Sequence, residues 1–163
     1  MSIPDMPSSK PILEINNLTQ FAVEDGFFEK VARETLSDSR RVCLAGKDVS
    51  ISVALVSEGE IAGLNKRYRE KDRPTDVLSF CEYADSEDLC NNEDKDVFLG
   101  EIILCPQYIT RSAKEQEVSF EFELAYIFSH GILHLLDFSH GKEMFSKQEE
   151  TARRLTDKKI KNI

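Results

Sequence analysis

The feature that most constrains this chain is its histidine pattern, because all three histidines fall within HGILHLLDFSH, residues 130–140. His130 and His134 lie in the most apolar stretch, 120–136, whose interspersed glutamate and histidine side chains predict a buried helix rather than a membrane span. Side chains four residues apart on a helix point the same way, so His130 and His134 can reach one ion. His140 must approach the same point from beyond a turn.

Helical geometry agrees with this arrangement. At about 100° per residue the two helical histidines share one face. The apolar side chains of the same helix gather on the other face: Leu124, Phe128, Ile132 and Leu135. Asp137 can adopt the left-handed conformation that the turn demands, though less readily than Gly. Three histidine ligands leave a fourth position for water, as in catalytic zinc sites, so the pattern predicts one Zn²⁺ per chain and hydrolytic chemistry.

Metzincin proteases share this histidine spacing in their motif HExxHxxGxxH, where the Glu after the first His is the general base. In this chain Gly131 stands at that position, and Asp137 replaces the Gly of the motif. A zinc peptidase is therefore an alternative function, but this chain lacks the general base of the protease motif.

Outside this region, short apolar runs alternate with helical patterns. They predict an α+β fold in a single domain, 1–163, with a mixed sheet of about four strands and about five helices packed on it. The expected strands lie near 12–15 and at 51–56, 77–80 and 101–105. The expected helices cover 27–36, 58–70, 107–115, a long stretch through His134, and 143–158. The order of the strands stays open.

Two segments are expected outside the packed core. Residues 1–11 have no basic region and no apolar region of a secretory signal, and are expected to form a flexible leader. Residues 82–97 contain six acidic side chains and one basic side chain within 85–96, which predicts a mobile acidic loop, too polar to pack.

The four cysteines are far apart, with no CxxC pair, at Cys43, Cys81, Cys90 and Cys105. In a chain without a secretory signal this spacing predicts reduced thiols and a cytoplasmic location. No membrane attachment is expected, because the most apolar stretch contains glutamate and histidine side chains.

The charge of the chain affects whether it can bind nucleic acid. The net charge of −9 repels nucleic acid on average. Residues 64–73 nevertheless hold five basic and two acidic side chains, at the end of a predicted helix, before a Pro-Thr-Asp turn. An anchored guanidinium there can hold a phosphate and stabilise charge in a transition state. A solvated basic face is the alternative interpretation.

These residues resemble the YbeY endoribonucleases, also called ribosomal RNA maturation factors. The hallmark of that family, HGxLHLxGxDH, is matched at His130, Gly131, Leu133, His134, Leu135 and His140. The block NxxYRxKDxPTDVLSF runs from Asn65 to Phe80, and FLGEIILCP at 98–106 resembles a third block, normally written GDI. Together the blocks cover most of 51–140 in the right order.

The resemblance implies a mixed four-stranded sheet and a zinc-dependent, single-strand-specific endoribonuclease that acts in 16S rRNA 3′-end maturation and ribosome quality control. By position it makes His130, His134 and His140 the metal ligands, and it makes Arg69 the basic residue that faces the metal. Glu101 falls where the family has an acidic residue linked to function and to contact with a ribosomal partner. The implied partners are ribosomal RNA, the small ribosomal subunit and a protein of that subunit, not DNA.

We therefore expect Arg69 and His130 to be catalytic, with Arg69 stabilising negative charge at the phosphate and Lys66 or Lys71 steering the RNA backbone. No obvious general base stands out. Glu101 is a candidate, and attack by a ribose 2′-hydroxyl in place of water is another possibility.

Three departures from the family pattern affect this expectation. Asp137 and Ser139 stand where the family has Gly and Asp, and Cys81 stands where it usually has Pro. An Asp beside a ligand can orient an imidazole, and losing such support typically weakens metal binding about 10–100-fold. Asp137 is the expected substitute. A non-catalytic ribosome assembly factor, in which zinc holds the last helix against the long one, is the second alternative.

Overall fold

The computed structural model describes residues 10–39 and 41–160. Its four-stranded sheet has the order β1-β2-β4-β3. The strands are β1 (Ile12–Asn17), β2 (Asp48–Leu55), β3 (Val77–Cys81) and β4 (Asp96–Leu104). β1, β2 and β4 are mutually parallel, whereas β3 pairs antiparallel with β4 at the edge. The predicted α+β fold with a mixed sheet is confirmed.

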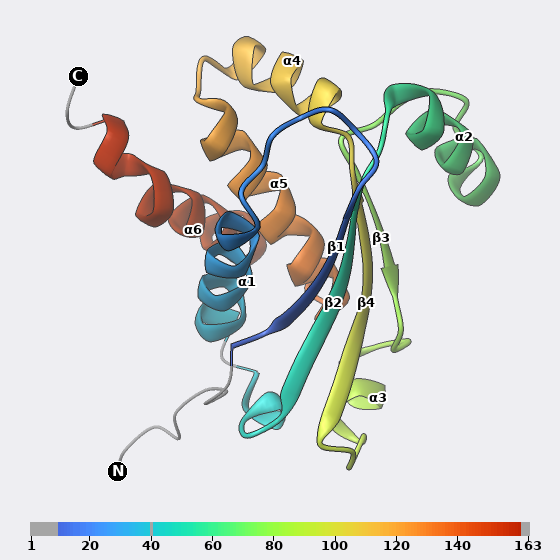
Figure 1. Cartoon of the computed structure of the whole chain (residues 1–163). Coiled ribbons are helices and arrows are strands. Elements are labelled where there is room, and N and C mark those ends of the chain that lie inside the picture. The colour runs from blue at the N-terminus through green and yellow to red at the C-terminus, as the bar shows by residue number, and fades with distance from the viewer. Residues whose placement is uncertain (1–9, 40, 161–163) are drawn as a thin grey trace.

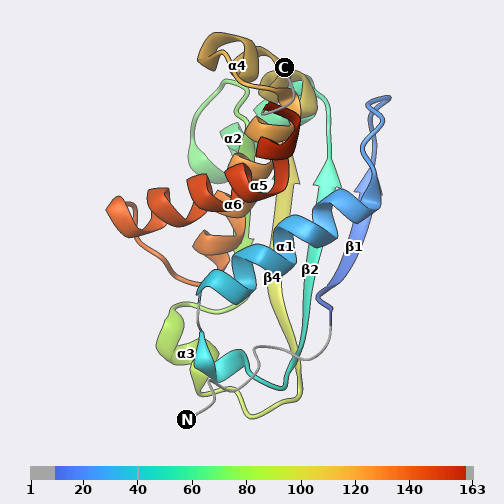
Figure 2. The same cartoon turned by 90° about the vertical axis from the view of Figure 1, so that its left-hand side faces the viewer.

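The helices in the described part of the chain number one more than expected. They are α1 (Asp25–Ser39), α2 (Glu58–Arg69), α3 (Ser86–Cys90), α4 (Pro106–Gln116), α5 (Phe120–Leu135) and α6 (Lys142–Ile160), with a 3-10 turn η1 (Val42–Leu44). Figure 1 shows α1, α5 and α6 together on one face of the sheet, and Figure 2 views the molecule from that side. The remaining sheet face is covered by α2 near one end only (Figure 1).

The core lies between the sheet and α5, because both elements turn an apolar face toward each other. β2 alternates strictly between buried and half-buried residues, as expected for a strand with helices on one side. The predicted apolar stripe of α5, Leu124, Phe128, Ile132 and Leu135, is at most 2% exposed. In the same core, the ring of Phe128 meets that of Phe28 from α1 edge to face at 5.1 Å.

Two glycines allow α5 and β3 to approach β4 closely. A Cβ atom at Gly131 would lie 3.2 Å from Ile102 and from the hydroxyl of Ser79. Gly100 has a φ of +141°, and a Cβ atom there would overlap the carbonyl oxygen of Phe80. Close packing at these two positions brings the end of α5 against the edge strand.

The prediction that 82–97 is too polar to pack was wrong. α3 lies inside this segment, and Leu89 is only 2% exposed. Asp85 caps this helix by accepting a hydrogen bond from the amide of Asp88 at 2.8 Å. A buried apolar residue and a local cap thus help to order a stretch whose composition is mainly acidic.

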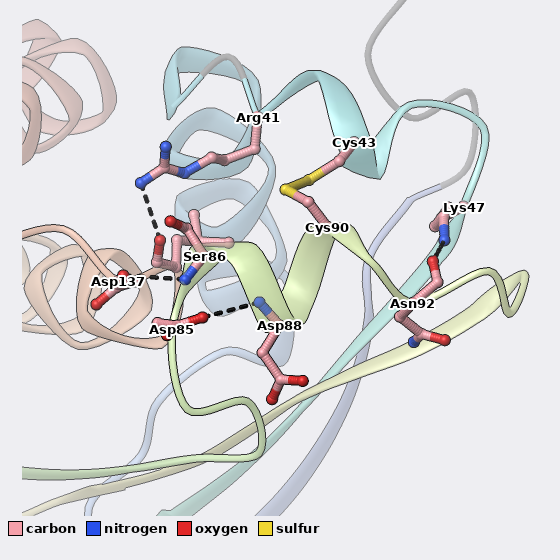
Figure 3. The surroundings of a disulfide bond; sticks show 10 residues. Arg41, Cys43, Lys47, Asp85, Ser86, Asp88, Cys90, Asn92 and Asp137 are labelled. Atoms are coloured by element: carbon pink, nitrogen blue, oxygen red, sulfur yellow. Dashed lines mark hydrogen bonds between the residues drawn. A yellow bond between two sulfur atoms is a disulfide. The ribbon is translucent and has the colours of Figure 1, made fainter.

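The prediction of reduced thiols was also wrong for one pair, since Cys43 and Cys90 form a disulfide (Figure 3). They are 47 residues apart in sequence, but α3 packs on η1 and brings their Cα atoms to 5.3 Å. Cys81 and Cys105 are free thiols.

The expected leader falls largely on residues 1–9, which lie outside the described residues. Among the residues that are described, no helix is both long and apolar enough to cross a membrane.

Candidate metal centre

The three histidines meet at one point. The Nε2 atom of His134 lies 3.0 Å from Nε2 of His130 and 3.1 Å from Nε2 of His140. Ring nitrogens this close need a proton or a cation between them, because their lone pairs repel. Zn–N bonds of about 2.0–2.1 Å in a tetrahedron would separate the nitrogens by roughly 3.3 Å, so the group can hold a metal ion with little adjustment.

Local backbone structure explains how the ligands converge. α5 starts at the N-cap Ser119, whose hydroxyl accepts from the amide of Phe122, and it carries two of the histidines on one face. The chain then reverses at Asp137, which has a φ of +65°, as predicted. The amide of Phe138 closes the reversal by donating to the carbonyl of Leu133 at 2.9 Å. This turn returns His140 to the end of the helix.

Gln148 on α6 orients one of these ligands, and sequence reasoning missed it. Its Oε1 atom lies 3.0 Å from Nδ1 of His130, and the residue is only 1% exposed. A buried amide oxygen in this position accepts the Nδ1 proton, so the lone pair of Nε2 points toward the other histidines. The only sequence signal was a polar residue on the buried face of an amphipathic helix.

The protonation of the site suits a metal ligand set. Burial, reinforced by the charges of His130 and His140, lowers the pKa of His134 to about 4. Burial also lowers the pKa of His130, although its hydrogen bond to Gln148 opposes the shift. Both imidazoles are therefore neutral near pH 7, the form that binds metal.

Arg69 is held at the edge of the sheet, next to this centre. α2 ends there because Glu70 takes the left-handed conformation, with a φ of +59°. The guanidinium of Arg69 donates to the carbonyl of Ser79 at 2.9 Å and lies 5.1 Å from the ring centre of Phe80. Only part of its fork of five N–H donors is used in this way, which leaves donors for a ligand.

A cleft joins the arginine to the histidines. Its volume is about 680 Å³, and its walls carry Asn65, Arg69, Lys71, Arg73, Pro74, Thr75, Asp76, Val77, Leu78, Tyr108, His130 and His140. Buried Asn65 shapes the basic wall by donating to the carbonyl of Arg73 at 2.9 Å. The structure thus brings Arg69 and Lys71 together with two of the histidines. Arg73 and Asp76 belong to the predicted basic segment and its Pro-Thr-Asp turn, but no role was predicted for either, and Tyr108 was not predicted at all.

Other predicted residues lie elsewhere. Lys66 is exposed and 3.8 Å from the carboxylate of Asp72, outside the walls of the cleft. Glu101 precedes Ile102, whose side chain contacts the α5 face, so alternation along β4 turns Glu101 to the opposite face of the sheet. Its cross-strand neighbour Phe80 packs on Tyr68 of α2, which agrees with that direction. Glu101 therefore does not face the histidines.

The turn residues also differ from expectation. The carboxylate of Asp137 accepts from the amide of Ser86 at 2.9 Å, which directs this oxygen toward α3. Ser139 is exposed on the same turn. Cys81 donates its thiol to the carbonyl of His134 at 3.5 Å, and burial, followed by the charge of Asp137, raises the pKa of that thiol.

Comparison with known proteins gives consistent matches. The family model described as Endoribonuclease YbeY matches residues 14–156. The Endoribonuclease YbeY of Bacillus subtilis is 36% identical over 150 residues, which cover 88% of this chain and 85% of that protein. That of Thermotoga petrophila is 43% identical over 109 residues, covering 63% of this chain and 65% of its own length, slightly under two thirds. A solution structure of a Thermotoga maritima protein matches with a TM-score of 0.58 and 32% identity over 93% of each chain.

Proposed function

Because the chain belongs to the YbeY endoribonuclease family, we propose that it is a zinc-dependent endoribonuclease that cleaves phosphodiester bonds in single-stranded RNA. The observation that carries this proposal is the meeting of three imidazole Nε2 atoms with Arg69 and Lys71 on the walls of one cleft. An anionic substrate with one phosphate near the histidines would contact both groups at once.

His130, His134 and His140 would hold the zinc ion, since neutral imidazole nitrogen is among its preferred ligands. When bound, zinc would supply Lewis acidity, which favours an oxygen nucleophile near neutral pH and offsets negative charge on the phosphate. Gln148 would keep His130 in the tautomer that leaves Nε2 free for the ion.

The basic wall of the cleft would bind and orient the RNA backbone. Arg69 is already fixed on the edge strand, so its free N–H donors can meet the scissile phosphate with little loss of entropy. As negative charge grows on the phosphate oxygens, these hydrogen bonds strengthen. Lys71 and Arg73 would bind neighbouring phosphates, a role that charge alone satisfies.

Asp76 is our choice for the group that accepts a proton from the nucleophile, either water or the ribose 2′-hydroxyl. It lies on the wall that also carries His130 and His140, and its charge opposes the lowering of the pKa of His130. Its backbone is held by the amide of Cys105, which donates to its carbonyl at 3.0 Å. The orientation of Glu101 toward the other sheet face favours Asp76 over Glu101.

A preference for unpaired RNA would follow from the cleft walls. Tyr108 presents an aromatic ring beside the basic residues, and unpaired bases stack on such rings whereas paired bases cannot reach them. Arg111 lies 5.4 Å from the centre of this ring, but an ion pair with Glu58 balances its charge, so the ring itself would carry the stacking.

In the cell the enzyme would act on ribosomal RNA, in 16S 3′-end maturation and ribosome quality control. The net charge of −9 disfavours binding to free RNA, so action within a small-subunit complex is the arrangement that we propose. Glu101, half-buried on the sheet face opposite α5, would be available to a basic protein of that subunit.

The test measures zinc content and cleavage of single-stranded RNA for the wild type, His134→Ala and Arg69→Ala. We expect near-stoichiometric zinc in the wild type, loss of zinc in the histidine variant and loss of cleavage in both variants. Zinc without cleavage, even with small subunits added, would favour the non-catalytic assembly factor. The zinc peptidase has little support, since Gly131 faces Ile102 and Ser79 rather than the cleft.

A further inference from the structure

The segment between the second and third histidines is positioned by contacts with residues that are distant in sequence. His134 lies in the last turn of α5, whereas His140 is exposed, and it precedes α6. The ring neighbours of His140 are the two other histidines and Phe145, whose ring centre is 6.3 Å away. Burial therefore does little to fix His140, and its position depends on residues 136–139, which we call the ligand link.

Two segments distant in sequence bind this ligand link (Figure 3). Arg41 donates from Nη2 to the carbonyl of Leu136 at 2.9 Å, and its guanidinium lies 4.3 Å from the ring centre of Phe138. From the other segment, the amide of Ser86 donates to the carboxylate of Asp137 at 2.9 Å. Three consecutive residues of the link thus have an external partner.

The Cys43–Cys90 disulfide joins these two segments to each other. Cys43 is two residues beyond Arg41, and Cys90 ends the short helix that Ser86 begins. Lys47 adds a second connection by donating to the carbonyl of Asn92. Figure 3 shows the sulfur bridge at the Cys90 end of α3 and the hydrogen bond from Ser86 to Asp137 at its other end.

α3 depends on this connection. A helix of five residues is too short to be stable by itself, and Leu89 is its buried apolar anchor. A covalent bond that closes a loop between positions 47 residues apart removes many alternative conformations of the segment. Without the bond, the amide of Ser86 would spend less time at the carboxylate of Asp137.

We propose that the Cys43–Cys90 disulfide is a positioning device for the metal centre. It fixes the segments that carry Arg41 and Ser86, these fix the ligand link, and the link fixes His140. The disulfide therefore raises the affinity for zinc without contacting the ion. The inference rests on the metal centre proposed above, and it assigns a role to two cysteines that the proposed reaction does not use.

The experiment measures the Kd for Zn²⁺ of the full-length apo protein, by competition with a chromophoric chelator, together with its Tm. In protein purified without reductant, a peptide map should find Cys43 and Cys90 linked. Cys43→Ser/Cys90→Ser should weaken zinc binding about tenfold or more, the range seen when support of a ligand is lost. Cys105→Ala, which removes a buried thiol distant from the link, should lower Tm but leave the Kd unchanged.

A single hydrogen bond can be removed with the disulfide intact. Ser86→Pro deletes the amide that donates to Asp137, at the first position of a helix, where proline is tolerated. The preceding Asp85 is already extended, with φ −159° and ψ 180°, as a residue before proline requires. This variant should weaken zinc binding in the same direction, whereas Ser86→Ala, which keeps the amide, should not.

The outcomes separate the two proposals. If the wild type binds no zinc, the metal centre itself is wrong. If the wild type binds zinc but both the cysteine variant and Ser86→Pro bind it within twofold of the wild type, only the positioning role is wrong. Free thiols at Cys43 and Cys90 in the purified protein would also overturn it. Should the cysteine variant not fold, Ser86→Pro decides alone.

Discussion

Burial decides the protonation of His134 in the folded chain. The pKa of this imidazole falls to about 4 from the ordinary value of 6.5. Between pH 6.5 and pH 4 the unfolded chain therefore binds more protons than the folded chain, and stability decreases as the pH is lowered. The stabilisation is fully present above pH 6.5 and is lost as the pH falls through about 4.

We expect the urea concentration at the unfolding midpoint of the metal-free wild type to decrease as the pH is lowered from 6.5 to 4. His134→Gln has no imidazole to protonate at this position, so its midpoint should fall less over the same window. Parallel curves for the two proteins would show that this histidine does not drive the pH dependence.

Gln148 illustrates how one buried amide can control a ligand. Replacement by Leu keeps a similar volume but leaves the Nδ1 proton of His130 without its acceptor. Zinc binding should weaken by roughly 10–100-fold, as is typical when such a partner is removed. Gln148→Glu should retain most of the affinity, because a carboxylate also accepts this proton. Gln116→Leu, at the exposed end of α4, is the control, and equal Kd values for all four proteins would exclude the orienting role.

Asp76 is the residue on which the proposed proton transfer depends. Asp76→Asn removes the basic oxygen while keeping the shape of the side chain, so cleavage should slow by roughly 10²–10⁴-fold with zinc content unchanged. Asp72→Asn, four residues earlier and exposed, should cleave RNA at the wild-type rate. A normal rate for Asp76→Asn would show that Asp76 is not the group that accepts the proton of the nucleophile.

At the scale of elements, the packing of β4 depends on one glycine. The register between β2 and β4 shifts between Ser50 and Ser52, and Gly100 lies opposite this irregularity with a φ that other residues rarely adopt. Gly100→Ala should lower the free energy of unfolding by about 1–3 kcal/mol, from backbone strain alone, and by more from overlap with Phe80.

Gly63→Ala is the matched substitution, because it lies inside α2 with open space around it. It should raise the free energy of unfolding by up to about 1 kcal/mol through helix propensity. Urea titrations of the two variants and the wild type give both values. A Gly100→Ala variant as stable as the wild type would mean that the strand can change register without loss.

Element positions were largely predictable. The runs near 12–15, 51–56, 77–80 and 101–105 all became strands, because apolar β-branched segments between turn residues have few alternatives. α3 was missed, since its order depends on Leu89 and on a disulfide partner in another segment.

At the scale of the whole molecule, the three histidines link α5 to α6, so metal binding should stabilise the complete fold. At a free zinc concentration roughly 100-fold above its Kd, binding would add about 2.7 kcal/mol to the free energy of unfolding. Chelation should therefore lower Tm by about 5–10 °C. His134→Ala should melt at the same temperature with and without chelator. A wild-type Tm that chelator leaves unchanged would argue against the centre.

The sequence by itself determined the features that depend on neighbouring residues. Two histidines four apart on an apolar helix share a face, and the third must return from beyond a turn. Asp137 was recognised as a residue that can adopt the left-handed conformation of this turn, and it does so. The basic segment before β3 was recognised on the same local grounds.

Only the tertiary structure decided which distant residues meet. Gln148 contacts His130 because α6 packs along α5, and Cys43 forms a disulfide with Cys90 because α3 packs on η1. Asp137 bonds to Ser86, 51 residues away, and Glu101 faces away from the site because of the register of β4. These contacts depend on how the helices pack against one another and on the register in which the strands pair. The hydrophobic periodicity of a single segment contains no information about either.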